Sequence, residues 1–287
     1  FFYNDIDDVL IDNVRMDGFD IGVHVGGSNS CSGNPGCDGS NDRITVRNST
    51  IINSWGQGFL GGGNGTRIEN NDFENNGTTP VFEHNIYLGG HTTGSRIIGN
   101  RLYRSAYRSN NMCEGASLVV HGVQNDLLIE NNVIREDVGA ASQQCWGIAV
   151  DPAYSTAESF TNVTIRGNEI RNVGNVGIGV AACSGCLIEN NVIVHGQAFG
   201  ITAIAAPDRT SGAGDAAMTA VRIRNNSIAV GSGGTGIYLG GEGANHEIVS
   251  NAIRHFGSDA AWACLETDLP NAAYDAIDHN LCDYPQG

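Results

Sequence analysis

The chain has 287 residues, of which 40 are Gly and 6 are Pro, and its formal net charge is −16. A surface this acidic repels phosphate backbones, so we expect no nucleic-acid partner. No run of about 18 apolar residues occurs, so we also expect no membrane-spanning helix. The first residue is Phe1 and not Met, which leads us to expect a mature chain or a piece of a longer one.

A short motif of alternating apolar and polar residues recurs along the chain. The segment 187–193 (LIENNVI) nearly copies the segment 128–134, and related segments occur at 67–73, 165–170, 223–228 and 248–253. Alignment of the copies gives one Asn in each, and the shortest spacing is 23 residues. The aligned residues are Asn13, Asn48, Asn71, Asn100, Asn132, Asn168, Asn191, Asn226, Asn251 and Asn280.

Each copy has a second half with the pattern Gly-Ile-x-Val, as at 147–150 and 177–180. Both halves have the period of two that is typical of strands. A repeated strand, turn and strand forms one coil of a parallel β-helix, because one coil alone cannot bury its apolar face. The recurring Asn tolerates a left-handed bend, and its amide can bond to the coils above and below. We therefore predict an all-β fold of about ten coils, as a single domain over residues 1–287.

This pattern resembles the pectate-lyase-like superfamily of single-stranded right-handed parallel β-helices over nearly the whole chain. The superfamily includes polysaccharide lyases, glycoside hydrolases, uronan epimerases and non-enzymatic modules. The resemblance implies a right-handed solenoid and a polysaccharide partner, but the fold alone does not select one activity.

The eight Cys form four local pairs in the sequence: Cys31 with Cys37, Cys113 with Cys145, Cys183 with Cys186, and Cys264 with Cys282. Such pairs suit disulfides in an oxidising compartment, so we expect a secreted or periplasmic protein. Buried free thiols are the alternative. No second CxxC or His pair stands at zinc-ligand spacing, so we expect no metal site.

The Gly-Ile-x-Val strand is the expected glycan-binding face. Its Ile and Val point inward, so positions one, three and five are expected to point outward. His121 and Asp151 then fall in one column on neighbouring coils, with Tyr87 one coil earlier. Insertions at 104–115, 135–146, 152–161 and 205–218 are expected to form groove walls. The predicted substrate-binding residues are Glu83, His84, Asn85, Arg104, Arg108, Glu114 and Tyr238.

A Tyr, His and Asp cluster suits removal of the C5 proton of a uronic acid. We predict His121 as base, Tyr87 as acid and Asp151 as the group that orients the histidine. Arg side chains near the groove, such as Arg104 and Arg108, are expected to neutralise the substrate carboxylate. Expulsion of the linked sugar gives β-elimination, and return of the proton on the other face gives epimerisation.

Two members of the superfamily sharpen this prediction. Mannuronan C5-epimerases carry an Asp-Pro-His motif beside a catalytic Tyr, whereas this chain has Asp151-Pro152-Ala153, so the motif histidine is absent. Calcium-dependent pectate lyases use an Arg or Lys base, but this chain has no Lys, and its outward column has no Arg. No cofactor is therefore indicated, and calcium stays open as an alternative that no motif supports.

Two other function classes stay open. A glycoside hydrolase needs two carboxyl groups, about 5–5.5 Å apart for retention or about 6.5–9.5 Å for inversion. Asp151 with Glu83 or Glu114 is one candidate pair, and Glu266 with Asp268 is another. A non-catalytic glycan-binding or adhesion module is the third hypothesis. The identity of the sugar and the oligomeric state do not follow from the sequence.

Overall fold

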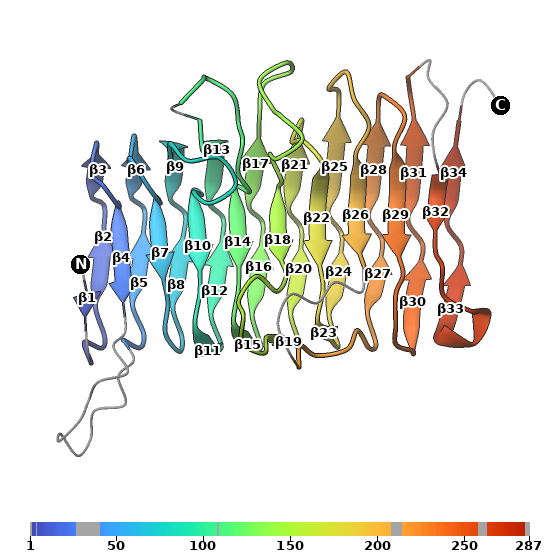
Figure 1. Ribbon diagram of the computed structural model, residues 1–287, viewed down its shortest axis with the longest axis horizontal. Coiled ribbons are helices and arrows are strands. Elements are labelled where there is room, and N and C mark those ends of the chain that lie inside the picture. The colour runs from blue at the N-terminus through green and yellow to red at the C-terminus, as the bar shows by residue number, and fades with distance from the viewer. Residues whose placement is uncertain are drawn as a thin grey trace.

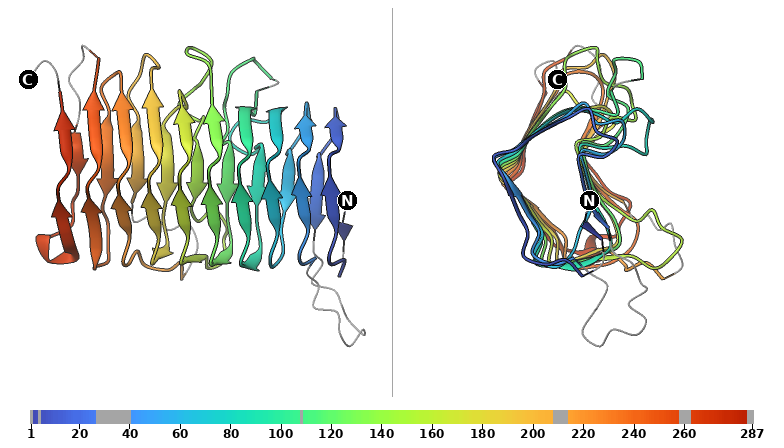
Figure 2. Two further views of the ribbon diagram at one scale, coloured as in Figure 1. Left: turned by 180° about the vertical axis from the view of Figure 1, so that it is seen from behind. Right: turned by 90° about the vertical axis from the view of Figure 1, so that its left-hand side faces the viewer.

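The computed structural model describes residues 2–3, 5–26, 41–107, 109–207, 214–257 and 263–284. Ten coils follow one another along a straight axis, and each coil contributes one strand to each of three ten-stranded sheets. The end view shows the coils superimposed around one elongated interior, with loops projecting at the corners (Figure 2). Every paired strand runs parallel to its neighbours, so the prediction of a parallel β-helix of about ten coils is confirmed.

The three sheets are called A, B and C. Sheet A contains β1 (Phe2–Tyr3), β4 (Val23–Gly26), β7 (Phe59–Gly61), β10 (Ile86–Leu88), β14 (Leu118–Val120), β18 (Ile148–Val150), β22 (Val176–Val180), β26 (Thr202–Ala206), β29 (Thr235–Leu239) and β32 (Ala263–Glu266). Sheet B contains β2 (Leu10–Asp12), β5 (Thr45–Arg47), β8 (Arg67–Glu69), β12 (Arg96–Ile98), β16 (Leu128–Glu130), β20 (Thr164–Arg166), β24 (Leu187–Glu189), β27 (Arg222–Arg224), β30 (His246–Val249) and β33 (Tyr274–Asp278). Sheet C contains β3 (Arg15–Asp17), β6 (Thr50–Ile52), β9 (Asp72–Asn76), β13 (Arg101–Ser105), β17 (Val133–Arg135), β21 (Glu169–Arg171), β25 (Val192–His195), β28 (Ser227–Val230), β31 (Ala252–His255) and β34 (Leu281–Asp283).

A short fourth sheet fills the corner between sheets A and B in the middle coils. It contains β11 (His91–Thr93), β15 (Val123–Asn125), β19 (Ser159–Thr161) and β23 (Cys183–Ser184). The one helix of the described chain is the 3₁₀ turn Asn271–Ala273. The described residues thus include no helix that is long and apolar enough to cross a bilayer.

The core is a set of aliphatic columns. In sheet B, for example, Ile97 pairs in register with Ile68 on one side and Ile129 on the other, and all three are fully buried. Branched side chains pack well on a pleated surface when one face is buried. Each coil therefore covers apolar side chains of the next coil. A single coil would leave these side chains exposed to water, so the coils are stable only when stacked.

A column of buried Asn side chains runs beside this core. The side-chain oxygen of Asn132 accepts hydrogen bonds from the backbone N–H and the side-chain amide of Asn100, both at 2.9 Å. The same pair of bonds recurs on each coil from Asn71 to Asn280, the last members being Asn251 and Asn280. The predicted Asn column is thus confirmed for eight of its ten members.

The two N-terminal members of that column were assigned wrongly. Asn13 and Asn48 have positive φ angles of 56° and 49°, and they stand one position before the buried column. Ser49 occupies the column instead, where its backbone N–H donates to Asn71. The left-handed backbone therefore belongs to one position, and the buried amide column belongs to the next position along the chain. The prediction had assigned both properties to the same Asn.

Several arginines form ion pairs between coils. Arg47 pairs with Asp12, Arg166 with Glu130, and each pair joins neighbouring strands of sheet B. On sheet C, Arg101 pairs with Asp72 of the coil before it. Arg104, which was predicted to face the glycan, likewise pairs with a carboxylate of the next coil, that of Asp137.

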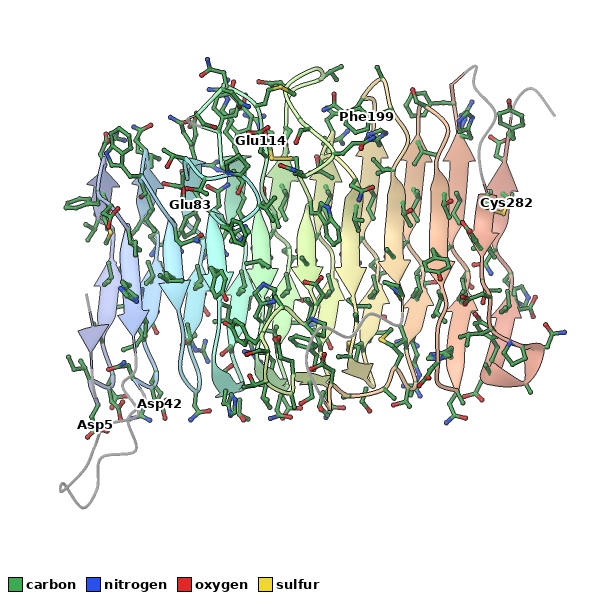
Figure 3. The ribbon with its side chains drawn as sticks, in the orientation of Figure 1. Asp5, Asp42, Glu83, Glu114, Phe199 and Cys282 are labelled. Carbon is green, nitrogen blue, oxygen red and sulfur yellow. A yellow bond between two sulfur atoms is a disulfide. The ribbon has the colours of Figure 1, made fainter. Side chains whose placement is uncertain are left out.

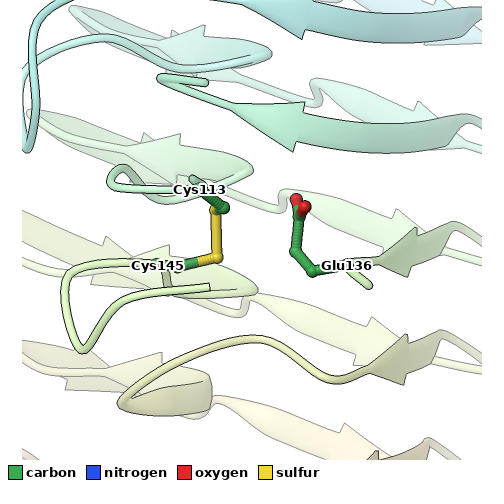
Figure 4. A group of neighbouring side chains, drawn as sticks. All are labelled: Cys113, Glu136 and Cys145. Carbon is green, nitrogen blue, oxygen red and sulfur yellow. A yellow bond between two sulfur atoms is a disulfide. The ribbon is translucent and has the colours of Figure 1, made fainter. Parts of the chain in front are cut away.

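Three of the four predicted disulfides are present: Cys113–Cys145, Cys183–Cys186 and Cys264–Cys282. Cys31 and Cys37 lie outside the described residues. Cys113–Cys145 joins the loops that follow β13 and β17, and thereby pins the two insertions that were predicted to form groove walls (Figure 4).

The carboxyl of Glu136 lies beside this disulfide (Figure 4). Burial raises the pKa of Glu136 well above its ordinary range, although the backbone N–H groups of Arg104 and Ser105 donate to it. The ligand atoms of Cys113, Glu136 and Cys145 lie within 4.8 Å of one another. Both sulfur atoms are in the disulfide, so they offer no thiolate to a metal ion.

Candidate functional site

The outer face of sheet A carries a cavity of about 510 Å³ over β10, β14 and β18. Its floor is apolar, because Ala116, Val119 and Ala149 are buried and pack with Tyr87 and Trp146. Polar side chains from beside the strand ends and from the flanking loops line its walls. The polar and aromatic lining residues are Phe82, His84, Tyr87, His121, Gln143, Gln144, Trp146, Asp151, Tyr154 and Asn175.

The three residues of the predicted centre all line this cavity. Tyr87 pairs in register with Val119, and Val119 with Ala149, so His121 and Asp151 follow on the next two coils in one column. His121 is 8% exposed and Asp151 is 7% exposed. Both side chains are therefore largely buried on the outer face of sheet A, where the cavity reaches them.

The orientation of His121 comes from the backbone. Its Nδ1 lies 2.6 Å from the carbonyl oxygen of Asp151. A carbonyl only accepts, so Nδ1 carries the proton and Nε2 of the neutral ring keeps its lone pair. This orienting role was predicted for the Asp151 carboxylate, but the group that accepts from Nδ1 is the Asp151 main-chain carbonyl.

His84 repeats this arrangement one coil earlier. Its Nδ1 lies 2.9 Å from the carbonyl oxygen of Ala116, so its Nε2 is also an acceptor. Burial lowers the pKa of His84 to about 4. At neutral pH His84 is therefore an uncharged ring on the wall of the cavity.

Two tyrosines complete the polar cluster. The hydroxyl oxygens of Tyr87 and Tyr154 lie 2.6 Å apart. The His121 ring lies between them, with ring centroids 5.4 Å from Tyr87 and 5.5 Å from Tyr154. Burial raises the pKa of both tyrosines, which keeps both hydroxyls protonated at neutral pH. The cluster thus combines imidazole nitrogens that can accept hydrogen bonds with phenol hydroxyls that can donate them.

Tyr154 was not predicted, although the insertion that carries it was predicted as a groove wall. Buried Glu158 fixes this loop, because its carboxylate accepts from the backbone N–H groups of Ala153, Tyr154 and Gly122. The loop also needs Gly89 beneath it, where an added Cβ would lie 2.8 Å from the Tyr87 ring and 3.0 Å from the Tyr154 hydroxyl. An aromatic residue in an insertion beside the outward column was the available signal.

Asn85 is a wrong prediction, because it is fully buried. Its side chain bonds to the Asn76 amide and to the carbonyl oxygen of Tyr103. The chain bends from sheet C into sheet A at this position, and the polar groups of the bend need partners. The alternation of inward and outward side chains in this coil therefore begins only at Tyr87. His84, just before the bend residue Asn85, lines the cavity.

Glu83 and Glu114 stand at the loop ends of their coils and are not among the cavity-lining residues (Figure 3). The Glu83 carboxylate accepts from the backbone N–H groups of Thr78 and Thr79, so it closes its own loop. The proposed pairing of either glutamate with Asp151 is thus not formed in the cavity. Asp151 is the one carboxylate among the described lining residues.

The remaining predicted binding residues lie elsewhere. Arg104 lies on β13 of sheet C. Its guanidinium pairs with Asp137 at 3.4 Å and lies over the Tyr103 ring. Tyr238 shares the outward column of Tyr87 but is five coils away, and its hydroxyl lies 3.5 Å from Asp268. Arg108 lies outside the described residues. The described lining of the cavity contains no Arg, so the expected Arg neutralisation is not supported.

Amide groups take the place of the missing cations. Gln143, Gln144 and Asn175 line the cavity, and all three residues are exposed. A side-chain amide has two N–H donors and can bind a carboxylate or a sugar hydroxyl. The site is therefore suited to a polar, hydroxyl-rich ligand.

Residues 146–269 match a family model described as the right handed beta helix region. The fold is also similar to two solved mutants of the tailspike protein of E. coli bacteriophage HK620 in complex with a pentasaccharide. The first is 12% identical with a TM-score of 0.58, and covers 91% of this chain and 44% of that chain. The second is 11% identical with a TM-score of 0.52, and covers 96% of this chain and 55% of that chain. This chain thus spans about half of those proteins. No curated protein matches it.

Proposed function

We propose that this right-handed parallel β-helix acts on a polysaccharide laid along sheet A, over the cavity that holds His121 and the two tyrosines, by β-elimination or C5-epimerisation of a uronic-acid unit. The observation that carries the proposal is the pairing of an imidazole held as a base with protonated tyrosines in one cavity. The pentasaccharide held by the similar tailspike structures supports a glycan as ligand.

The chemistry follows from the tautomer of His121. Its Nε2 takes the C5 proton, and the electron pair left at C5 is stabilised by the adjacent carboxylate. In elimination this pair forms the C4=C5 double bond as the C4–O bond breaks, and a tyrosine hydroxyl protonates the leaving oxygen. In epimerisation the tyrosine instead returns a proton to the opposite face of C5. The Tyr87–Tyr154 pair is protonated as either step requires.

The substrate carboxylate must be neutralised for the C5 proton to become acidic. Hydrogen bonds from Gln143, Gln144 and Asn175 would serve this purpose in the absence of a nearby Arg. Neutral His84 adds no positive charge at neutral pH, but its Nε2 can accept from a sugar hydroxyl. A hydrolase is the weaker alternative, because a carboxylate pair is required and Asp151 stands alone in the described cavity.

The test uses polymannuronate, polygalacturonate and neutral xylan as substrates. Elimination creates an unsaturated end that absorbs in the far ultraviolet, and epimerisation in D₂O places deuterium at C5. A hydrolase creates reducing ends without either signal. Only the first two outcomes support the proposal.

Two variants then test the assignment. We expect His121→Ala to lower kcat by at least about 100-fold, as is usual for loss of a general base. Tyr87→Phe removes one hydroxyl and should lower kcat while the fold is unchanged. The control is His279→Ala, because that ring is 79% exposed at the C-terminal end of the solenoid. Equal activity of His121→Ala and the control would contradict the proposal.

We also propose that the protein works in an oxidising compartment, as a secreted or periplasmic enzyme. The support is that all six Cys of the described residues are in disulfides. Reduction of isolated protein to thiols without loss of activity or stability would count against this location.

A further inference from the structure

Three exposed aromatic side chains stand together at the N-terminal end of the solenoid. Phe19 is 55% exposed, Trp55 is 56% exposed and Phe82 is 73% exposed. Each lies in the connection from sheet C to sheet A, between β3 and β4, β6 and β7, and β9 and β10 (Figure 1). These three residues are called the aromatic row.

Hydrogen bonds hold the row on adjacent coils. The Trp55 backbone N–H donates to the Phe19 carbonyl at 2.8 Å, and the Gln57 side chain donates to the Phe82 carbonyl at 2.7 Å. Neighbouring coils of a parallel sheet are about 4.8 Å apart. This spacing is close to the length that one pyranose unit occupies in an extended glycan.

The row is continuous with the candidate site. Phe82 lines the cavity together with Val81, while Trp55 and Phe19 continue past it toward the N-terminal end. Of the large hydrophobic side chains that are exposed in the described chain, four are Phe or Trp, and three of these four are in the row. An exposed ring has a flat apolar face that can cover the C–H face of a sugar, as aromatic residues do at half-wet sites.

We infer that the aromatic row is a set of glycan subsites, which extends the bound polysaccharide from the cavity toward the first coil. This inference rests on the proposed function. It adds that the substrate is a polymer several units longer than the cavity holds. A second copy of the chain is the less suitable occupant, because the three rings are already partly buried and offer about 400 Å² on each copy, whereas a stable interface buries at least about 600 Å² on each partner.

The test compares chain lengths. Polymannuronate and polygalacturonate oligosaccharides of increasing length are assayed with wild type, Trp55→Ala and Phe19→Ala. We expect each substitution to raise KM for long chains about fivefold to tenfold, because the ring no longer contacts the apolar face of a sugar. The value of kcat should be unchanged, since the ring lies outside the cavity. Chains short enough to fill only the cavity should have unchanged KM. Trp55→Phe keeps a ring and should restore most of the affinity for long chains.

Phe256→Ala is the matched control, because Phe256 is a 48% exposed ring near the other end of the solenoid. If KM changes equally for all chain lengths, or for none, the inference is overturned. It is also overturned if wild type sediments as an oligomer that Trp55→Ala dissociates. Failure of the proposed chemistry gives a different result. Long chains would then quench the tryptophan fluorescence of wild type but not that of Trp55→Ala, and no product would form. That result supports the aromatic row as a binding surface and contradicts only the enzyme activity.

Discussion

His84, on the wall of the cavity, should make the stability of the folded protein sensitive to mild acid. Burial lowers the pKa of His84 to about 4, against an ordinary value of 6.5. The unfolded chain therefore takes up a proton below about pH 6.5, whereas the folded chain does so only near pH 4. The stability that His84 contributes is complete above pH 6.5 and is lost as the pH falls through the window from 6.5 to 4.

The size of this loss follows from the two pKa values. Their difference of about 2.5 corresponds to about 3.4 kcal/mol over the whole window, at about 1.36 kcal/mol for each pKa unit. Between pH 7 and pH 4.5 about 2.4 kcal/mol of it should be lost.

The assay is urea unfolding of wild type and His84→Gln at pH 7 and pH 4.5, followed by circular dichroism. Glutamine still donates to the Ala116 carbonyl but does not titrate. The free energy of unfolding of the variant should fall by about 2.4 kcal/mol less than that of wild type. His91→Gln, a change at an exposed histidine on β11, should behave like wild type. Equal pH sensitivity of wild type and His84→Gln would refute the reasoning.

Three further predictions concern the surroundings of the cavity. Gly89→Ala places a methyl group against the Tyr154 hydroxyl, so kcat should fall at least tenfold with little change in melting temperature, and normal kcat would show that the tyrosine pair is not needed. Glu136→Gln removes a buried group that ionises only at a cost, so the variant should exceed wild type in free energy of unfolding at pH 9 more than at pH 5, and a smaller gain at pH 9 would contradict this. Replacing Cys113 and Cys145 by Ser opens a loop with a sequence separation of 32, which should lower the free energy of unfolding by about 3–4 kcal/mol in urea titrations; a loss below about 1 kcal/mol would mean that the wall loops stay ordered without the bond.

The coil architecture could be predicted because its cause is periodic. The sequence shows the alternation of apolar and polar residues on strands that recur once per coil. It also shows the Asn that recurs at the same position of each coil. The same register placed His121 and Asp151 on neighbouring coils. What repeats along the chain could therefore be located without coordinates.

The errors lie where the repeat is interrupted. Asn85 was assigned outward by extending the strand alternation into a bend, where the backbone turns the side chain inward. Tyr154 sits in an insertion outside the repeated strands, so the strand register could not place it. Arg104 was assigned to the glycan for its charge alone, whereas Glu74 and Asp137 on the neighbouring coils pair with it.

The Asn column has a consequence for how the protein can change. Each amide in it accepts from the coil before and donates to the coil after, so replacing Asn132 alone would strand two donors of Asn100 in the interior. Successive members are nevertheless separated by between 23 and 36 residues, since the loops at the corners absorb the difference. A longer loop at a corner should therefore cost the solenoid little stability, whereas a single substitution in the Asn column leaves buried donors unpaired and should destabilise two neighbouring coils at once.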